Sequence, residues 1–396
     1  MFIFYTILYL VLLYFSYFFA IILPHQAFIF SAIRECYFVY LFFLLFYKIV
    51  IVKQARIDFS HFNKLICSIL FFAIPYIFIS NYLNYAVITF FLYFSGPILF
   101  LLISNLSFSK KTIEHFNFWF NLIMSGICFL NILFYFVQDN LISLIPTEYF
   151  SFFSRQEGKM RYLGIAFHPT CTGFFFIYFI GYVFIVKRNL IASLFNGIFF
   201  LFTGTRSAIF GVPFYMFLKF KKYTKIFAFV LGSVVLASVY MLLAKNRLNM
   251  YLDGSALAHL YHLFVLGPET VIKYPWGAGL GTVSPYNQDN PIIHLESEAY
   301  LYCIQLGFFN FILKIVLYYH IVRKLLIVNS RMSNYLIFVL FTFLAGCLVF
   351  GLNDIRFVSN FVWVMLGIEF SKCEYHRILP AKRKFYKWRR LCLALR

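Results

Sequence analysis

Long runs of apolar residues alternate with short polar segments along almost the whole chain. Most runs are about 17 to 25 residues long, which is the length that an α-helix needs to cross roughly 30 Å of hydrocarbon. The first run is too long for the core of a signal peptide, so we interpret it as a retained helix. The pattern predicts about twelve transmembrane helices, at residues 2–23, 35–52, 65–80, 84–103, 115–137, 167–186, 190–203, 207–218, 226–244, 298–319, 334–352 and 356–371.

The composition leads to the same class of protein. Hydrophobic residues make up 63% of the 396 residues and charged residues only 12%, which is outside the range of soluble domains. We therefore expect an all-α integral membrane protein, in which residues 1–396 form a single polytopic membrane domain.

The basic residues fall mainly in alternate loops, and this predicts the orientation. If the N-terminus is cytoplasmic, 23 of the 34 lysines and arginines lie on the inner side and nine on the outer side. Short cytoplasmic loops carry an excess of lysine and arginine, so both termini are predicted to be cytoplasmic, with 372–396 as a basic cytoplasmic tail. The +20 charge then serves to anchor the chain at anionic membrane lipids, and no basic soluble domain is present to bind nucleic acid.

Motifs for metals and cofactors are not evident in the sequence. The eight cysteines lie singly in or beside the apolar runs and form no Cys-x-x-Cys pair. Neither a zinc site nor a disulfide framework is indicated. No Walker or dinucleotide-binding glycine motif occurs either, so we expect no metal and no cofactor.

Two long segments are predicted on the outer face, and both are rich in polar residues. The first, 138–166, carries Arg155 and Arg161 shortly before an apolar run. The second, 245–297, is the large external loop between the ninth and tenth spans. It contains a glycine-rich turn region and ends with His294 and Glu296, directly before Glu298 at the start of the tenth span. These residues are candidates for a site on one side of the membrane.

Arg206 is the most unusual charge, because it lies between two short apolar runs in the stretch FLFTGTRSAIFGV. A charge near the bilayer centre costs several kcal/mol, so Arg206 is expected either in a tight external turn or at an outward-facing junction that binds an anion. Simpler interpretations stay open elsewhere as well. Arg155 and Arg161 suit solvated loop charges, and Glu296 and Glu298 suit caps of a helix N-terminus.

At these residues the chain resembles the Wzy-type O-antigen polymerase and O-antigen ligase superfamily, over nearly its full length. TGTRSAIFG is similar to a junction of short helices that carries a single arginine, here Arg206. MRYLGIAFHPT is similar to an Arg-x-x-Gly-x-x-x-x-Pro motif before a later span, matching Arg161, Gly164 and Pro169. The many spans and the large external loop before the tenth span also match.

A third motif favours one branch of this superfamily. ESEAYLYCIQLGFFN is similar to the loop-to-helix motif, in which the polar pair Glu296 and Ser297 is followed by Gly307. Ligases usually have histidine at the first position, whereas this chain has Glu296, with His294 two residues earlier. The resemblance therefore leans toward a polymerase.

The resemblance implies transfer of a glycan from a polyprenyl diphosphate onto a lipid-linked repeat unit, at the periplasmic face of a bacterial inner membrane. The substrates would be undecaprenyl-diphosphate-linked oligosaccharides, and a chain-length regulator protein is a further implied partner. Guanidinium groups stabilise a diphosphate leaving group by bidentate hydrogen bonds. Arg206 is the first candidate for this role, Arg161 the second, and Arg155 the third.

The acceptor hydroxyl needs a base within hydrogen-bond reach. Glu296 is the first candidate, and Glu298 and His294 are the alternatives. The diphosphate is already a good leaving group, so the reaction is expected to be metal-independent.

Other functions remain open at this point. An O-antigen ligase would transfer the glycan to the lipid A core instead. A lipid-linked glycan flippase would commonly build its site from broken helices and charges at the membrane midplane, whereas this sequence concentrates polar groups at one surface. A scaffold of an envelope assembly complex would leave Arg206 and Glu296 replaceable.

Overall fold

We describe the chain from a computed structural model, which covers residues 1–23, 26–52, 61–80, 82–106, 108–142, 155–156, 159–160, 163–203, 205, 212, 215, 261–282, 297–349 and 356–371. The predicted spans at 207–218 and 226–244 lie wholly or almost wholly outside these residues, as does the predicted tail at 372–396.

The described part is helical apart from a pair of two-residue antiparallel strands, β1 (Arg155–Gln156) and β2 (Lys159–Met160). The helices from the N-terminal part are α1 (Phe2–Tyr14), α2 (Ser16–Ile22), α3 (Ala27–Val50), α4 (His61–Ala73), α5 (Pro75–Ile79), α6 (Leu83–Ser104) and α7 (Lys110–Ile142). Those that follow are α8 (Pro169–Gly181), η2 (Tyr182–Lys187), α9 (Leu190–Phe202), η5 (His262–Leu266), α13 (Gly267–Lys273), α14 (Glu298–Val328), α15 (Arg331–Val349) and α16 (Arg356–Phe370).

The prediction of a multi-pass helical membrane protein is confirmed. Within the described residues, 6 helical segments are long and apolar enough to cross a membrane, and α1 with α2 makes up to 7 if this pair, bent by 55°, is one span. α9 is apolar but shorter. The number of about twelve spans stays a prediction.

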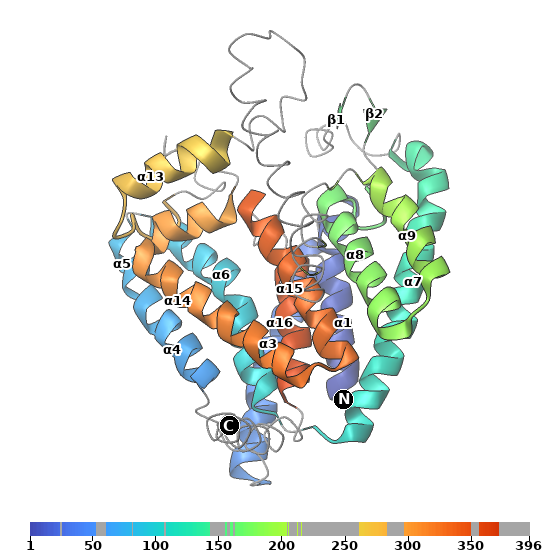
Figure 1. The fold of residues 1–396 in the computed structure, drawn as a ribbon, viewed down its shortest axis with the longest axis horizontal. Helices are drawn as coiled ribbons and strands as arrows, with labels where there is room; N and C mark the ends of the chain where they lie inside the picture. Colours follow the sequence, from blue (N-terminus) through green and yellow to red (C-terminus); the bar gives the residue numbers. More distant parts are fainter. Residues whose placement is uncertain are drawn as a thin grey trace, which may run out of the picture.

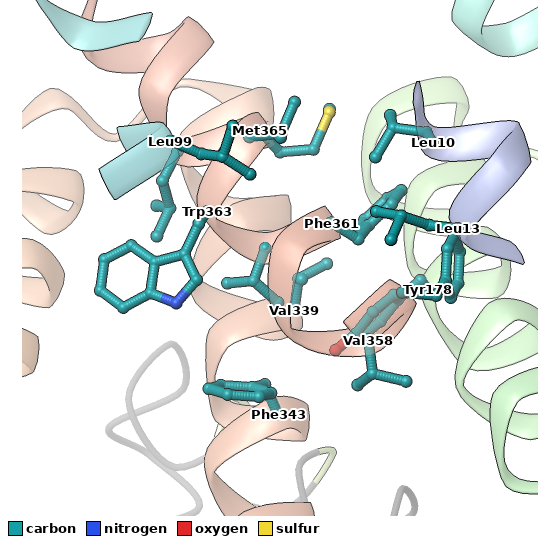
Figure 2. Close-up of a cluster of buried hydrophobic side chains, with 14 of the residues drawn as sticks. Leu10, Leu13, Leu99, Tyr178, Val339, Phe343, Val358, Phe361, Trp363 and Met365 are labelled. Atoms are coloured by element: carbon teal, nitrogen blue, oxygen red, sulfur yellow. The ribbon is translucent and has the colours of Figure 1, made fainter. Parts of the chain in front are cut away.

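α16 forms the centre of the bundle. Its side chains from Phe357 to Phe370 are buried on every side of the helix, which is the pattern of a helix surrounded by other helices. It packs most extensively against α6 and also contacts α15, α1 and α8. Figure 2 shows this core, with Val358, Phe361, Trp363 and Met365 of α16 among Leu10, Leu13, Leu99, Tyr178, Val339 and Phe343.

Glycines allow the central helices to approach one another closely. A Cβ added at Gly96 of α6 would lie 2.1 Å from a ring carbon of Trp363, and one added at Gly367 of α16 would lie 2.9 Å from Ile103. In lipid the hydrophobic effect does not drive helices together, so their association depends on close packing, which small residues allow. The α6–α16 pair therefore depends on these glycines.

Large apolar side chains cover the outside of the bundle. Phe42 and Phe43 of α3, Phe118 and Phe129 of α7, and Ile191 of α9 are each more than half exposed. Exposed apolar area of this extent is unfavourable in water and favourable against lipid tails. These helices form the lipid-facing surface.

The bundle has two distinct ends, visible in Figure 1. α13, the β1–β2 pair and the start of α14 lie at one end, which we call the loop end, and the N-terminus lies at the opposite, basal end. The β1–β2 pair and the segment 261–282 thus share one side of the molecule, as the sequence pattern predicts for the two external loops. Which end faces the cytoplasm stays a prediction from the basic residues.

Candidate functional site

The structure describes the predicted site residues only in part. Arg155 pairs through its backbone with Met160 in the β1–β2 hairpin. Glu298 is the predicted site residue whose side chain is described, and it begins α14 as expected. The other four residues lie outside the described part of the chain: Arg161, Arg206, His294 and Glu296.

Glu298 is buried at the start of α14. Its exposure is only 3%, and that of the preceding Ser297, which occupies the N-cap position, is 1%. A carboxylate in the first turn of a helix is favoured by the helix dipole. A simple surface cap would be solvated, however, so the depth of Glu298 indicates a more specific role.

α14 is broken at Gly307, and the break shapes the whole region. Gly307 has φ 77° and ψ 163°, a conformation that is essentially restricted to glycine. In Figure 1 the first part of α14 lies beneath α13, and the second part turns back across the bundle. The break therefore brings residues of the second part near residues of the first.

The backbone groups freed by the break are paired with the segment 275–279. The N–H of Ala278 donates to the carbonyl of Ile304 at 2.7 Å, and the N–H of Phe308 donates to the carbonyl of Pro275 at 3.0 Å. The hydroxyl of Tyr76 in α5 donates to the carbonyl of Trp276 at 2.8 Å. Irregular backbone at membrane depth is tolerated where its polar groups are satisfied in this way.

The glycine run of the large loop is required for this docking. Gly277, Gly279 and Gly281 have φ values of 90°, 98° and 76°. A Cβ at Gly277 would lie 2.7 Å from the backbone nitrogen of Gly307, and one at Gly281 would lie 2.7 Å from that of Ala86. The run, which indicates little in the sequence, is thus a packed element between α5, α6 and α14.

A group of polar and aromatic side chains surrounds the break, and we call Tyr93, Glu298, Tyr302, Gln305 and Lys314 the break cluster. The Lys314 ammonium lies 3.7 Å from the ring centre of Tyr302 and 5.7 Å from that of Tyr93. Its charge also interacts with that of Glu298. The buried hydroxyl of Tyr302 has no hydrogen-bond partner within the described part of the chain.

Gln305 ties the break cluster to the glycine run. Its Oε1 accepts a hydrogen bond from the N–H of Gly281 at 2.8 Å, and its Nε2 donates to the hydroxyl of Tyr93 at 3.1 Å. The side chains of Gln305 and Glu298 are both buried. Gln305 thereby holds the glycine run against the break cluster.

The break cluster gathers three kinds of hydrogen-bonding group. It combines a carboxylate that accepts hydrogen bonds, an ammonium, and a buried phenol with a hydrogen to donate. Lys314 is not among the predicted site residues, although it is visible in the sequence as a lysine inside the predicted span 298–319. An ionisable residue inside a membrane segment indicates a functional site by default.

The motif that contains Arg161 leads into α8 through an ordered turn. Gly164 has φ 63°, and a Cβ there would lie 2.4 Å from the Asn131 side chain. Asn131 of α7 accepts a hydrogen bond from the N–H of Ile165 at 3.0 Å. The hydroxyl of Thr172 donates to the carbonyl of Leu163 at 2.5 Å. The turn after Arg161 is therefore held rigidly between α7 and α8.

His168 caps α8 directly before the membrane segment. Its Nδ1 accepts a hydrogen bond from the N–H of Cys171 at 3.3 Å, and its ring lies 4.4 Å from that of Tyr17. Burial lowers the pKa of His168 from 6.5 to about 4, because the charged imidazolium loses its solvation. At neutral pH the capping nitrogen is therefore an acceptor.

We expect this cap to weaken in acid. Because the pKa of His168 is about 4 in the folded protein and 6.5 without the fold, the unfolded chain binds the proton more tightly. The stability from neutral His168 is full above about pH 6.5 and is lost as the pH falls toward 4. Between pH 7 and pH 5, the unfolding temperature of the purified wild-type protein should fall by more than that of the variant His168→Asn. Asparagine keeps a capping oxygen that does not titrate in this range. Equal slopes for the two proteins would contradict this assignment.

Comparisons add no assignment to this geometry. Among the described residues, no group of three or more histidine, cysteine, aspartate or glutamate side chains is placed to hold a metal ion. No protein-family model matches the chain, and no curated protein matches it. The functional conclusion therefore rests on the site and on the motifs of the sequence.

Proposed function

We propose that the chain is a surface-polysaccharide polymerase of the O-antigen type. It would transfer a glycan from undecaprenyl diphosphate onto a lipid-linked repeat unit, at the periplasmic face of a bacterial inner membrane. The observation that carries the proposal is the buried carboxylate of Glu298 at the start of α14, which belongs to the break cluster and lies two residues after Glu296. The resemblance of three motifs supports the reaction class.

The proposed topology places the chemistry outside the cytoplasm. About twelve spans with both termini cytoplasmic would put 138–166 and 245–297 in the periplasm. This agrees with the common position of β1–β2 and α13 at the loop end. Membrane lipids and a chain-length regulator protein are the further proposed partners.

Arginines would stabilise the leaving group. A lipid diphosphate gains negative charge as the glycosidic bond to the donor glycan breaks, and guanidinium groups bind phosphate oxygens in a bidentate way. We assign this role to Arg206 first, with Arg161 and Arg155 as supporting candidates. The rigid turn from Leu163 to Thr172 supports Arg161, because it would fix the position of the chain just after that residue.

A carboxylate would accept the proton of the acceptor hydroxyl as the new glycosidic bond forms. Glu296 is the first candidate and Glu298 the second, with His294 as a further alternative. Glu298 lies in the first turn of α14 and interacts with Lys314, and this position suits a supporting role near the acceptor sugar.

The test is polymer formation by purified protein with defined lipid-linked repeat units. Arg206→Ala is expected to lower the rate by about a hundredfold or more, since removal of one oxyanion-stabilising donor typically has that effect. Arg206→Lys should recover little, because it keeps the charge and loses the planar fork. Glu296→Gln should lower turnover while leaving donor binding largely intact.

Matched controls locate the base. Glu298→Gln and His294→Ala are compared at equal protein level, and Arg331→Gln at the basal start of α15 controls for loss of a positive charge. If Glu296→Gln polymerises normally while His294→Ala is inactive, the base is His294 and a ligase becomes the better assignment. Full polymer synthesis by Arg206→Ala would refute the proposed role of that arginine.

One observation favours a second candidate, a lipid-linked glycan flippase. Transporters commonly combine broken helices with intramembrane charges, and α14 has both features, at Gly307 and Lys314. In proteoliposomes, a flippase would move a fluorescent lipid-linked glycan across the bilayer without forming polymer. Polymerisation without such movement would support the enzyme.

A further inference from the structure

A second polar group lies on helices that are far apart in the sequence. Arg34 of α3 donates to Oε1 of Glu35 from Nε at 3.0 Å and from Nη2 at 2.8 Å. Arg356, in the first turn of α16, donates to the same oxygen at 2.5 Å. We call Arg34, Glu35 and Arg356 the arginine pair site.

This site carries an excess positive charge. Within the described residues one carboxylate faces two guanidinium groups, and the hydrogen bonds to it use a minority of their N–H donors. The side chains of Arg34 and Arg356 are only 12% and 23% exposed, so solvent screens their charges weakly. Such an arrangement is favourable when an anion occupies it.

The group beneath the site adds a further donor. The buried hydroxyl of Tyr9 accepts a hydrogen bond from Nδ2 of Asn360 at 2.8 Å, which leaves its own hydrogen to donate. Asn360 is fixed in turn by the hydroxyl of Ser95, which donates to its Oδ1 at 3.1 Å. Asn360 lies one helical turn after Arg356 in α16, so the phenol of Tyr9 that it binds lies close to the site.

The depth of the site selects the kind of anion. Arg34 lies about two helical turns from the start of α3, inside the candidate span Ile29–Val50, so it is within reach of lipid headgroups by its long side chain if α3 spans the membrane. Arginine binds phosphate oxygens through two parallel hydrogen bonds, and a phosphate on a lipid is the anion available at that depth.

We propose that Arg34 and Arg356 bind the phosphate group of a membrane lipid. The site is additional to the one assigned to Arg206 and Arg161, and a reaction between two lipid-linked glycans would require two such sites. The inference does not need that reaction, because binding is measured without turnover. The same chemistry is offered by a polyprenyl diphosphate and by an anionic phospholipid headgroup.

The test is a titration of purified full-length protein in detergent, with bound lipid counted by native mass spectrometry. The probes are a polyprenyl diphosphate, the matching polyprenol without phosphate, and phosphatidylglycerol. Arg34→Gln and Arg356→Gln should each weaken binding of the diphosphate by about tenfold or more, since each removes charge-assisted hydrogen bonds. Glu35→Gln should tighten binding, because it removes the competing carboxylate.

Lys273→Gln is the matched control, because it removes one exposed positive charge from α13. Unchanged binding in this variant, with loss in both arginine variants, supports the site. If phosphatidylglycerol binds as tightly as the diphosphate and its binding also requires Arg34 and Arg356, the site is supported and its occupant is a bilayer phospholipid. Three results would overturn the proposal. They are a loss of diphosphate binding in Lys273→Gln as large as in the arginine variants, binding of the polyprenol as tight as that of the diphosphate, and weaker diphosphate binding by Glu35→Gln than by the wild type.

Discussion

Gly307→Ala is expected to lower the unfolding temperature sharply, because the break in α14 cannot form with a side chain at this position. The φ of 77° and ψ of 163° are strained for any other residue, at a cost of about 1 to 3 kcal/mol. The added Cβ would also lie 2.7 Å from the carbonyl oxygen of Trp276, which the docked segment holds in place. Thermal unfolding of the purified protein in detergent measures the change.

Gly126→Ala supplies the control for this prediction. Gly126 lies inside α7, and a Cβ there would meet nothing within 4 Å. Alanine has the higher helix propensity, so this variant should unfold at the wild-type temperature or above it. If Gly307→Ala unfolds like Gly126→Ala, α14 is continuous and the docking of 275–279 against it is wrong.

Lys314→Met is expected to destabilise the protein by about 3 kcal/mol, since removing one partner of a buried charged group leaves the other uncompensated. The ammonium lies 3.7 Å from the ring centre of Tyr302, and its charge interacts with Glu298. Methionine is unbranched and only one atom shorter than lysine, and it removes the charge and the N–H donors. Chemical unfolding in mixed detergent gives the free energy.

A double variant shows whether the two charges act together. Lys314→Met with Glu298→Gln should recover most of the lost stability, because no buried charge is left. Lys273→Met, an exposed lysine of α13, should change the free energy of unfolding by less than about 0.5 kcal/mol. Additive losses in the double variant would show that Glu298 and Lys314 do not interact.

The extent of several helices was predictable from the apolar runs alone. The run at 84–103 corresponds to α6 (Leu83–Ser104), and the run at 190–203 corresponds to α9 (Leu190–Phe202). In a membrane, backbone polar groups must be satisfied within the segment, so a sufficiently long apolar run forms a helix whatever its partners. The expected start of a helix at Glu298 follows from the same rule.

The apolar pattern was less informative where a run contains a bend. The run at 2–23 forms two helices, α1 and α2, that meet at an angle of 55°. The run at 298–319 extends to Val328 and is broken at Gly307. A bend depends on backbone angles and on the groups that pair with the freed N–H and carbonyl groups. Neither of these changes the hydrophobicity along the chain, so the apolar pattern does not show where a bend lies.

The sequence by itself determined the membrane class, the position of most described helices and the concentration of polar residues in segments between them, because these follow from local hydrophobicity and charge. Only the tertiary structure decided which polar residues meet. Because α14 is broken, Lys314 in its second part contacts Tyr302 in its first part. The N–H of Ala278 donates to a carbonyl that the break leaves free. Arg356 reaches Glu35 across 321 positions of the chain. Such contacts depend on how helices pack in three dimensions, and helical periodicity describes one helix at a time.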